Sequence, residues 1–201
     1  MTVNEDLARQ RATTYLDDAA TTMAALRTAC LDDILAAAHV LVASFRADGA
    51  LLICGNGGSA ADAQHLATEF VSTLTLAHTR PAMRAIALTT DSSALTAIAN
   101  DFGVERMFAR QVEALGRPGD VLMAISTSGN SANVLAAAAA ARAGGLHVIA
   151  LTGASGGSLG PEADVAIRVP STETGHIQEC HLAIEQLIAL LAERELYPDP
   201  T

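Results

Sequence analysis

Two short stretches of the chain carry groups that bind a phosphate ester. The first, 55–59, combines three glycines with Ser59 and follows the apolar run 51–54. The second, 126–131, places four hydroxyls within six residues after the apolar run 121–125. Each stretch leads into a helical pattern, and the free N–H groups at a helix start favour an anion. We expect both stretches to bind one phosphate monoester; the alternatives are a structural glycine turn and ordinary helix capping.

A histidine and a glutamate lie one turn apart in the helix expected after the first stretch. His65 and Glu69, at positions i and i+4, share one face of that helix. Gln178 and Gln186, in the closing helical pattern, can add amide oxygens. Histidine is the commonest side-chain metal ligand, and carboxylate and amide oxygens complete divalent-metal sites. These residues indicate a metal site or a proton-transfer pair, with a solvated ion pair as the alternative.

The first stretch also fits the loose dinucleotide-binding pattern G-x-G-x-x-A. That pattern expects an acidic residue about 20 residues further on, to bind a ribose. Asp91, the conceivable partner, lies about 30 residues beyond the loop. The spacing is therefore a poor match to a dinucleotide site.

Apolar runs that alternate with helical patterns must position these groups. Such alternation, without tight hairpin signals, predicts an α/β fold with a doubly wound, five-stranded parallel sheet flanked by helices. Ligands of such sheets bind beyond the carboxyl ends of the strands, where both polar stretches fall. We expect residues 1–48 to form an N-terminal helical extension used in oligomer packing, and residues 49–201 to form one domain. The expected strands are 51–54, 83–88, 121–125, 146–151 and 165–169.

Composition limits the classes of partner. The formal net charge of −10 argues against a nucleic-acid partner and against an anionic membrane surface. The chain has no signal-peptide pattern and no apolar run of roughly 18 residues, so we expect a cytoplasmic protein. The three cysteines, Cys30, Cys54 and Cys180, lack zinc-type spacing and are expected to be reduced core residues.

The chain from Gly49 onward resembles the sugar isomerase (SIS) domain family and, within it, the phosphoheptose isomerases. The resemblance is specific because several motifs carry it in order along nearly the whole segment. The matching stretches are 54–65, 99–103, 109–121, 125–131, 151–153 and 177–179.

This resemblance implies a homotetramer with active sites at subunit interfaces and one zinc ion per subunit. It implies conversion of sedoheptulose 7-phosphate to glycero-manno-heptose 7-phosphate through an enediol, which needs a base, an acid and stabilisation of the enediolate. Glu69 is implied as the base, and His65, Glu69 and Gln178 as metal ligands. The implied substrate-binding residues are Asn56, Gly57, Gly58, Ser59, Glu69, Asn100, Asp101, Ser126, Thr127, Ser128, Ser131 and Gln178.

One position departs from the family pattern. Family isomerases carry a histidine, as metal ligand and acid or base, at the position of Gln186 in this chain. An amide oxygen can bind a metal, but an amide does not exchange protons near neutral pH. His181 cannot simply replace that histidine, because the two positions differ by about 140° around the helix. The substitution predicts zinc binding with weakened, altered or lost isomerase activity.

Two alternatives follow from that departure. One is a noncatalytic tetrameric scaffold resembling the bacterial DnaA initiator-associating protein, whose partner would be the initiator protein. That scaffold lacks Glu69 and the full 126–128 triplet, which this chain keeps. The other is an isomerase of a different phosphosugar, in which His181 or a neighbouring subunit supplies the missing proton transfer.

Overall fold

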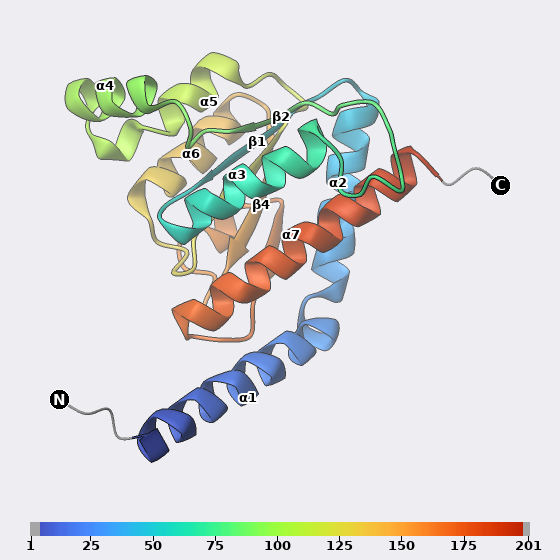
Figure 1. The fold of residues 1–201 in the computed structure, drawn as a ribbon. Helices are drawn as coiled ribbons and strands as arrows, with labels where there is room; N and C mark the ends of the chain where they lie inside the picture. The colour runs from blue at the N-terminus through green and yellow to red at the C-terminus, as the bar shows by residue number, and fades with distance from the viewer. Residues whose placement is uncertain (1–4, 199–201) are drawn as a thin grey trace.

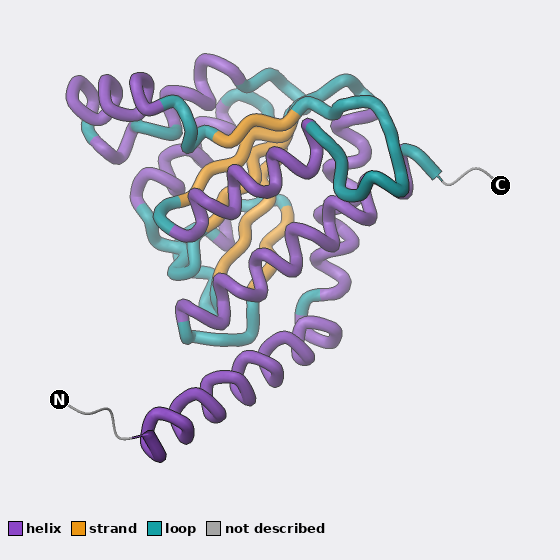
Figure 2. The backbone as a smooth tube through the Cα atoms, in the orientation of Figure 1, coloured by secondary structure: helices purple, strands orange, loops and turns teal. Residues whose placement is uncertain are grey.

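The computed structural model describes residues 5–198, which form one five-stranded sheet with helices on both faces (Figures 1 and 2). Residues 1–4 of the expected N-terminal extension and residues 199–201 of the expected domain lie outside the described residues. The strands are β1 (Leu51–Gly55), β2 (Ala85–Ala87), β3 (Val121–Ile125), β4 (His147–Thr152) and β5 (Val165–Arg168). The α-helices are α1 (Glu5–Ala29), α2 (Leu31–Arg46), α3 (Gly58–Val71), α4 (Ser92–Phe102), α5 (Ala109–Leu115), α6 (Ala132–Ala143) and α7 (Thr174–Leu196); the 3-10 helices are η1 (Val104–Arg106) and η2 (Gly160–Glu162).

The strands lie in the order β2-β1-β3-β4-β5, and every neighbouring pair is parallel. All residues of β1 and β3 are buried, as a parallel strand covered by helices on both sides requires. Successive residues of β1 point to opposite faces: Leu51 and Ile53 belong to the core under α2, α3 and α7, whereas Leu52 and Cys54 belong to the core under α5 and α6. The predicted α/β fold with a doubly wound parallel sheet is confirmed.

Some element boundaries differ from those expected. The helix expected around 95–99 begins earlier because the Asp91 carboxylate accepts a hydrogen bond from the N–H of Ala94 (2.9 Å), an N-cap. It ends at Gly103, whose φ of +88° favours glycine. The single helix expected over 104–115 is divided into η1 and α5. The edge strand β2 is shorter than its predicted span.

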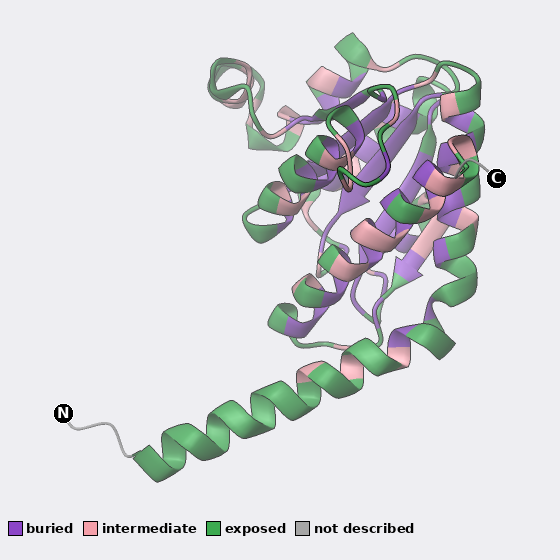
Figure 3. Cartoon of the chain, turned by 45° about the vertical axis from the view of Figure 1, so that its right-hand side comes forward, coloured by how far each residue is buried: buried purple, intermediate pink, exposed green. Residues whose placement is uncertain are grey.

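The N-terminal helices have contrasting environments. Helix α2 packs against α7, whereas α1 extends away from the body and contacts mainly the start of α7 (Figure 3). Within this chain Leu26 is the buried residue of α1, while Leu16 is 66% exposed. No single helix within residues 5–198 is long and apolar enough to cross a membrane; only α1 and α2 together, bent by 67°, meet that test.

Candidate active site

The two predicted phosphate stretches are brought together by the pairing of β1 with β3. Gly55, the last residue of β1, is in register with Ile125, the last residue of β3. The direction in which successive strands are added reverses between these two strands, and ligands of such sheets bind at this switch point. The loops that follow β1 and β3 therefore share one edge of the sheet.

The first loop leaves backbone groups free at the start of α3. Gly57 has a φ of +57°, which only glycine adopts readily. A Cβ on Gly58 would come within 2.9 Å of Gln178 Oε1, so α7 lies close against the loop. Among the described residues, no side chain caps α3. Its first N–H groups are therefore available to an anion.

The second loop gathers hydroxyls at the start of α6. The Oγ atom of Ser131 lies 3.0 Å from Ser126 Oγ, which is 3.5 Å from Ser128 Oγ. Although Ser131 is the N-cap residue, neither it nor another described side chain caps the helix. Thr127 is half-buried beside them, and its carbonyl accepts a hydrogen bond from Gly153 N–H (3.0 Å). The hydroxyls therefore do not cap α6, although Ser128 Oγ accepts a hydrogen bond from Asn130 N–H (3.2 Å).

An amide pair that the sequence did not reveal joins the two loops. Asn56 Nδ2 donates to Asn133 Oδ1 (2.9 Å), and Asn133 Nδ2 donates back to Asn56 Oδ1 (2.8 Å). Asn133 lies in the first turn of α6, where an asparagine alone indicates only local capping. Its role becomes visible through the β1–β3 pairing, which no local pattern in the sequence predicts.

His65, Glu69 and Gln186 meet between α3 and α7, which lie side by side in Figures 1 and 2. His65 Nε2 is 2.9 Å from Glu69 Oε1 and 2.6 Å from Gln186 Nε2, and the amide nitrogen is 3.3 Å from Glu69 Oε1. The Glu69 side chain is 16% exposed and that of His65 is 46% exposed. The group is therefore shielded but open to a ligand.

This triangle of polar atoms suits a metal ion. If His65 Nε2 carries a proton, it can donate to Glu69 Oε1, but it then lies against the N–H donors of Gln186. If it carries no proton, it can accept from Gln186, but its lone pair then faces the carboxylate oxygen. Turning the amide presents its oxygen at the same point. Zinc–ligand distances near 2.0–2.1 Å place tetrahedral ligands about 3.3 Å apart, which equals the spacing of Gln186 and Glu69, whereas the other two spacings, 2.9 and 2.6 Å, are shorter. In residues 5–198, no three His, Cys, Asp or Glu side chains form a metal-binding group, so within this chain His65 and Glu69 could hold a metal only together with other donors, such as the Gln186 amide oxygen.

Gln178 is not part of this triangle. Its amide nitrogen donates to Asp62 Oδ2, and its oxygen accepts a hydrogen bond from Ser59 Oγ (3.3 Å). Burial raises the pKa of Asp62, and the nearby His65 opposes that shift. Gln178 therefore links α7 to the phosphate loop, and the structure separates it from the other three predicted metal ligands.

Asn100 and Asp101 are also apart from the loops within this chain. Both are exposed at the end of α4, where Asn100 Nδ2 donates to Asp101 Oδ1 (2.7 Å). Helix α4 packs chiefly against η1 and projects from the body (Figure 1). The structure thus leaves these two predicted substrate-binding residues untested.

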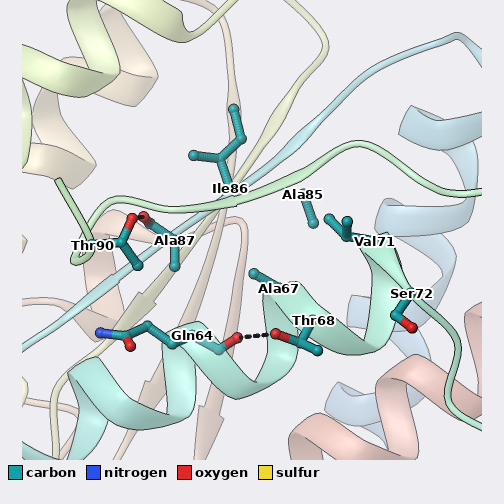
Figure 4. A pocket seen from close by; sticks show the side chains of 9 residues that line it. All are labelled: Gln64, Ala67, Thr68, Val71, Ser72, Ala85, Ile86, Ala87 and Thr90. Carbon is teal, nitrogen blue, oxygen red and sulfur yellow. Dashed lines mark hydrogen bonds between the residues drawn. The ribbon is translucent and has the colours of Figure 1, made fainter.

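A hollow of about 430 Å³ lies between α3 and the edge strand β2 (Figure 4). Gln64 and Thr68, from the same helix as His65 and Glu69, line it, and the Thr68 hydroxyl donates to the carbonyl of Gln64. Among the described residues that line it, none is a predicted site residue, and most of the exposed lining is apolar. This hollow does not have the chemistry of a sugar-phosphate site.

Comparisons with known proteins agree with this arrangement. The SIS domain family matches residues 14–153. A phosphoheptose isomerase of Roseiflexus sp. (strain RS-1) is 55% identical over 166 residues, covering 83% of each chain. The chain belongs to the phosphoheptose isomerase family. The solved structure of a phosphoheptose isomerase from Neisseria gonorrhoeae matches with a TM-score of 0.86 and 41% identity, covering 92% of this chain and 98% of that one; the enzyme from Francisella tularensis gives 0.89 and 34%, covering 96% and 100%.

In this member of the phosphoheptose isomerase family, His181 is a core residue. It is 0% exposed, and its Nε2 lies 3.2 Å from the carbonyl oxygen of Thr152. Burial lowers the pKa of His181 to about 4, and the contact with Thr152 only partly offsets the shift. Its position argues against the alternative in which His181 replaces the missing family histidine.

A second buried group on α7 was missed by the sequence interpretation. Glu185 is 1% exposed, and neither carboxylate oxygen has a hydrogen-bond partner among the described residues. Burial raises the pKa of Glu185 to about 9, with a further contribution from the charge of Asp62. A single charged residue in an amphipathic helix usually indicates a solvated face, so its burial was not predictable.

Proposed function

We propose that the protein interconverts sedoheptulose 7-phosphate and glycero-manno-heptose 7-phosphate, as an aldose–ketose isomerase of the phosphoheptose isomerase family. The observation that carries the proposal is the placement of Glu69 on α3, the helix that begins at the phosphate loop. His65 lies about 9 Å along the helix axis beyond Ser59. A sugar held by its phosphate at the loop can therefore extend along α3 toward the His65–Glu69 pair.

The phosphate would bind at the joint edge of the two loops. The free N–H groups of α3 and α6 and the hydroxyls of Ser126 and Ser131 supply hydrogen-bond donors without a positively charged side chain. Because the protein carries a net charge of −10, local dipoles must hold the anion. This binding positions the carbonyl end of the sugar and leaves the chemistry to α3 and α7.

The proton transfer would use Glu69. Conversion of ketose to aldose removes a proton from C1, forms an enediol and returns a proton to C2. The Glu69 carboxylate can accept the first proton and return it to the neighbouring carbon, while His65, 2.9 Å away, fixes its orientation. Gln186 can donate a hydrogen bond to a sugar oxygen but cannot exchange a proton. We expect the accompanying transfer between the two sugar oxygens to limit turnover.

A zinc ion fits the same residues, and we propose that His65, Glu69 and Gln186 hold it. Their polar atoms lie 2.6, 2.9 and 3.3 Å apart, and their chemistry, an imidazole, a carboxylate and an amide, suits a divalent metal. When bound, zinc supplies polarisation of the sugar carbonyl. Gln178 completes the predicted ligand set only if its amide leaves Asp62.

We also propose a homotetramer in which the N-terminal helices pack against neighbouring subunits. Leu7, Leu16 and Met23 of α1 are 42%, 66% and 38% exposed, which is costly for an isolated helix in water. A neighbouring subunit would cover them. Light scattering after size-exclusion chromatography tests the assembly. Location in the cytoplasm stays a prediction from the sequence.

The decisive experiment incubates purified protein, with and without zinc, with sedoheptulose 7-phosphate in deuterated water. We expect the heptose product and deuterium incorporation next to the carbonyl, both lost in Glu69→Gln. Fructose 6-phosphate serves as a comparison substrate. Turnover of that sugar alone would assign a different phosphosugar, and the absence of exchange with either sugar would contradict the isomerase.

A noncatalytic scaffold is the second candidate, and Gln186 is the observation that favours it. An amide at this position supplies neither an acid nor a base. Absence of turnover, together with tight binding of purified DnaA initiator protein, would support the scaffold. Turnover abolished by Glu69→Gln would exclude it as the protein's only function.

A further inference from the structure

The loop between α3 and β2 runs over the end of α7 and returns to the sheet (Figures 1 and 2). It carries Arg80, whose Nε atom lies 2.9 Å from Glu193 Oε2 of α7. Both side chains are 1% exposed. Burying two charges costs free energy that a good ion pair only partly restores. The other hydrogen bonds of the guanidinium therefore matter for the stability of this buried ion pair.

Three of those contacts are made with backbone carbonyls at the end of α3, and a fourth joins Nη1 to the carbonyl of Pro81 in the loop itself (3.0 Å). Arg80 Nη2 donates to the carbonyl of Glu69 (2.6 Å), and Nη1 donates to the carbonyls of Phe70 (2.8 Å) and Ser72 (3.3 Å). The last carbonyls of a helix lack partners within it and carry partial negative charge. One buried cation thus contacts the final turn of α3, which has no glycine C-cap, and the Phe70 carbonyl also accepts a hydrogen bond from Met83 N–H (3.0 Å).

This final turn carries Glu69, and helix ends fray where their carbonyls have no partner. Arg80 bonds to the backbone of the residue that the proposed reaction uses as its base. Its other partner, Glu193, lies two turns beyond Gln186 on α7. One guanidinium therefore joins the two helices whose separation sets the 3.3 Å contact between Glu69 and Gln186.

We propose that Arg80 and Glu193 are positioning residues, which hold the Glu69 carboxylate at its place against α7. The proposal rests on the proposed function of Glu69. Neither residue touches the phosphate loops, so their contribution falls on the catalytic step and not on substrate binding. Lysine cannot replace Arg80, because one ammonium cannot reach the carboxylate and the three carbonyls in the same planar arrangement.

The experiment compares Arg80→Lys with Arg84→Lys, a matched control. Arg84 lies on the same loop, is exposed and donates to the carbonyl of Asp48, away from α3. With sedoheptulose 7-phosphate we expect kcat of Arg80→Lys to fall about tenfold or more with KM within twofold, because small displacements of a catalytic group are costly. Arg84→Lys should match the wild type. A kcat within twofold of wild type in Arg80→Lys would overturn the proposal.

A purely structural role is separated by replacing the pair together. Arg80→Met leaves the Glu193 charge buried alone and is expected to lower stability strongly, whereas a double substitution to methionine removes both charges and restores most of it. Positioning predicts that kcat stays low in the stable double variant, because the Glu69 carbonyl still lacks its hydrogen bond from the guanidinium and the link to α7 is still missing. Recovery of kcat together with stability would show that the pair acts on folding alone.

Zinc affinity distinguishes failure of this proposal from failure of the proposed function. Absence of turnover in the wild type contradicts the isomerase, whereas binding of zinc to His65 and Glu69 still reports the placement of that turn. We expect at least tenfold weaker zinc binding in Arg80→Lys than in Arg84→Lys. Equal zinc affinity of Arg80→Lys and Arg84→Lys would overturn the positioning role. The positioning role would also be overturned if the wild type and both variants neither bound zinc nor turned over the sugar.

Discussion

The phosphate end and the carbonyl end of the candidate site are built from different parts of the protein. At the phosphate end, two loops at the switch point of the sheet present backbone N–H groups and clustered hydroxyls, and Asn56 and Asn133 join them. At the carbonyl end, side chains from two helices meet at a triangle of polar atoms. The phosphate end combines backbone donors with several hydroxyls, whereas the carbonyl end depends on the identity of single side chains.

This difference predicts that the two ends of the site tolerate side-chain substitution differently. Backbone donors persist through many side-chain substitutions because every residue except proline supplies an N–H group. At the position where the resemblance to the family implies a histidine, Gln186 offers an amide oxygen to a metal but no acid–base group. We therefore expect substrate binding and turnover to respond separately to substitution.

The largest effect is expected for Glu69→Gln, which should lower turnover without weakening substrate binding. The amide keeps the shape of the side chain but cannot accept the proton, so kcat should fall by about 10³-fold. KM should change less than threefold, since the phosphate loops are untouched. Steady-state kinetics with sedoheptulose 7-phosphate measure both, and circular dichroism checks the fold. A comparable rise in KM would break the proposed division of roles.

Gln186→His should have the opposite effect on the same end. A histidine can exchange protons near neutral pH, and general acid–base catalysis contributes about 10²–10⁴-fold. We expect kcat to rise about 10-fold to 100-fold and to acquire a dependence on pH near 6–7. Leu182→His, one turn earlier on α7, is the control. An unchanged kcat would show that proton transfer at this position does not limit turnover.

The phosphate end is tested by the double variant Ser126→Ala and Ser131→Ala. Loss of two hydroxyl donors to a charged oxygen should raise KM about 10-fold to 30-fold while leaving kcat within about threefold. Ser158→Ala is the matched control, because this exposed serine contacts Asn130 through its backbone N–H. If kcat falls more than KM rises, these hydroxyls belong to the chemical step.

The smallest kinetic effect is expected for His181→Gln, whose kcat should stay within about twofold of wild type. Its effect should appear in stability. Burial lowers the folded-state pKa of His181 to about 4, so the unfolded chain binds more protons between pH 6.5 and 4 and stability falls as the pH is lowered. The slope has an upper limit of about 1.4 kcal/mol per pH unit.

Thermal unfolding measured from pH 7 to pH 4.5 checks the stability effect. We expect the melting temperature of the wild type to fall more steeply with acid than that of His181→Gln, whereas His147→Gln, at an exposed site, should behave like the wild type. A large loss of kcat in His181→Gln would show that this histidine takes part in catalysis.

The sheet and the phosphate loops were predictable because their signals are local. An apolar run followed by glycines and hydroxyls indicates strand, loop and helix start, and parallel strands must end at one edge. The His65–Glu69 pair was likewise predictable from helical spacing. Shared family motifs extended this interpretation to the function, and the comparisons confirm the family.

Long-range contacts were not predictable from such patterns. Asn133 gains its partner from a strand pairing about 80 residues away, and Arg80 is buried because a loop crosses α7. Nor does helical spacing show that Gln178 contacts Asp62 instead of the Glu69 group. These placements depend on how the elements pack, which the sequence specifies only collectively.

The closed pair of amides between Asn56 and Asn133 has a consequence for redesign of the protein. Each amide satisfies the other within the pair, so the bridge needs no contribution from the sugar to hold the loops in register. The two loops could be retained as a binding site for phosphorylated compounds. Residues of α7 and its neighbours could then be varied to accept shorter or differently branched carbon chains. Such substitutions would belong to the turns of α7 beyond Gln178, because Gln178 itself contacts Ser59 of the phosphate loop.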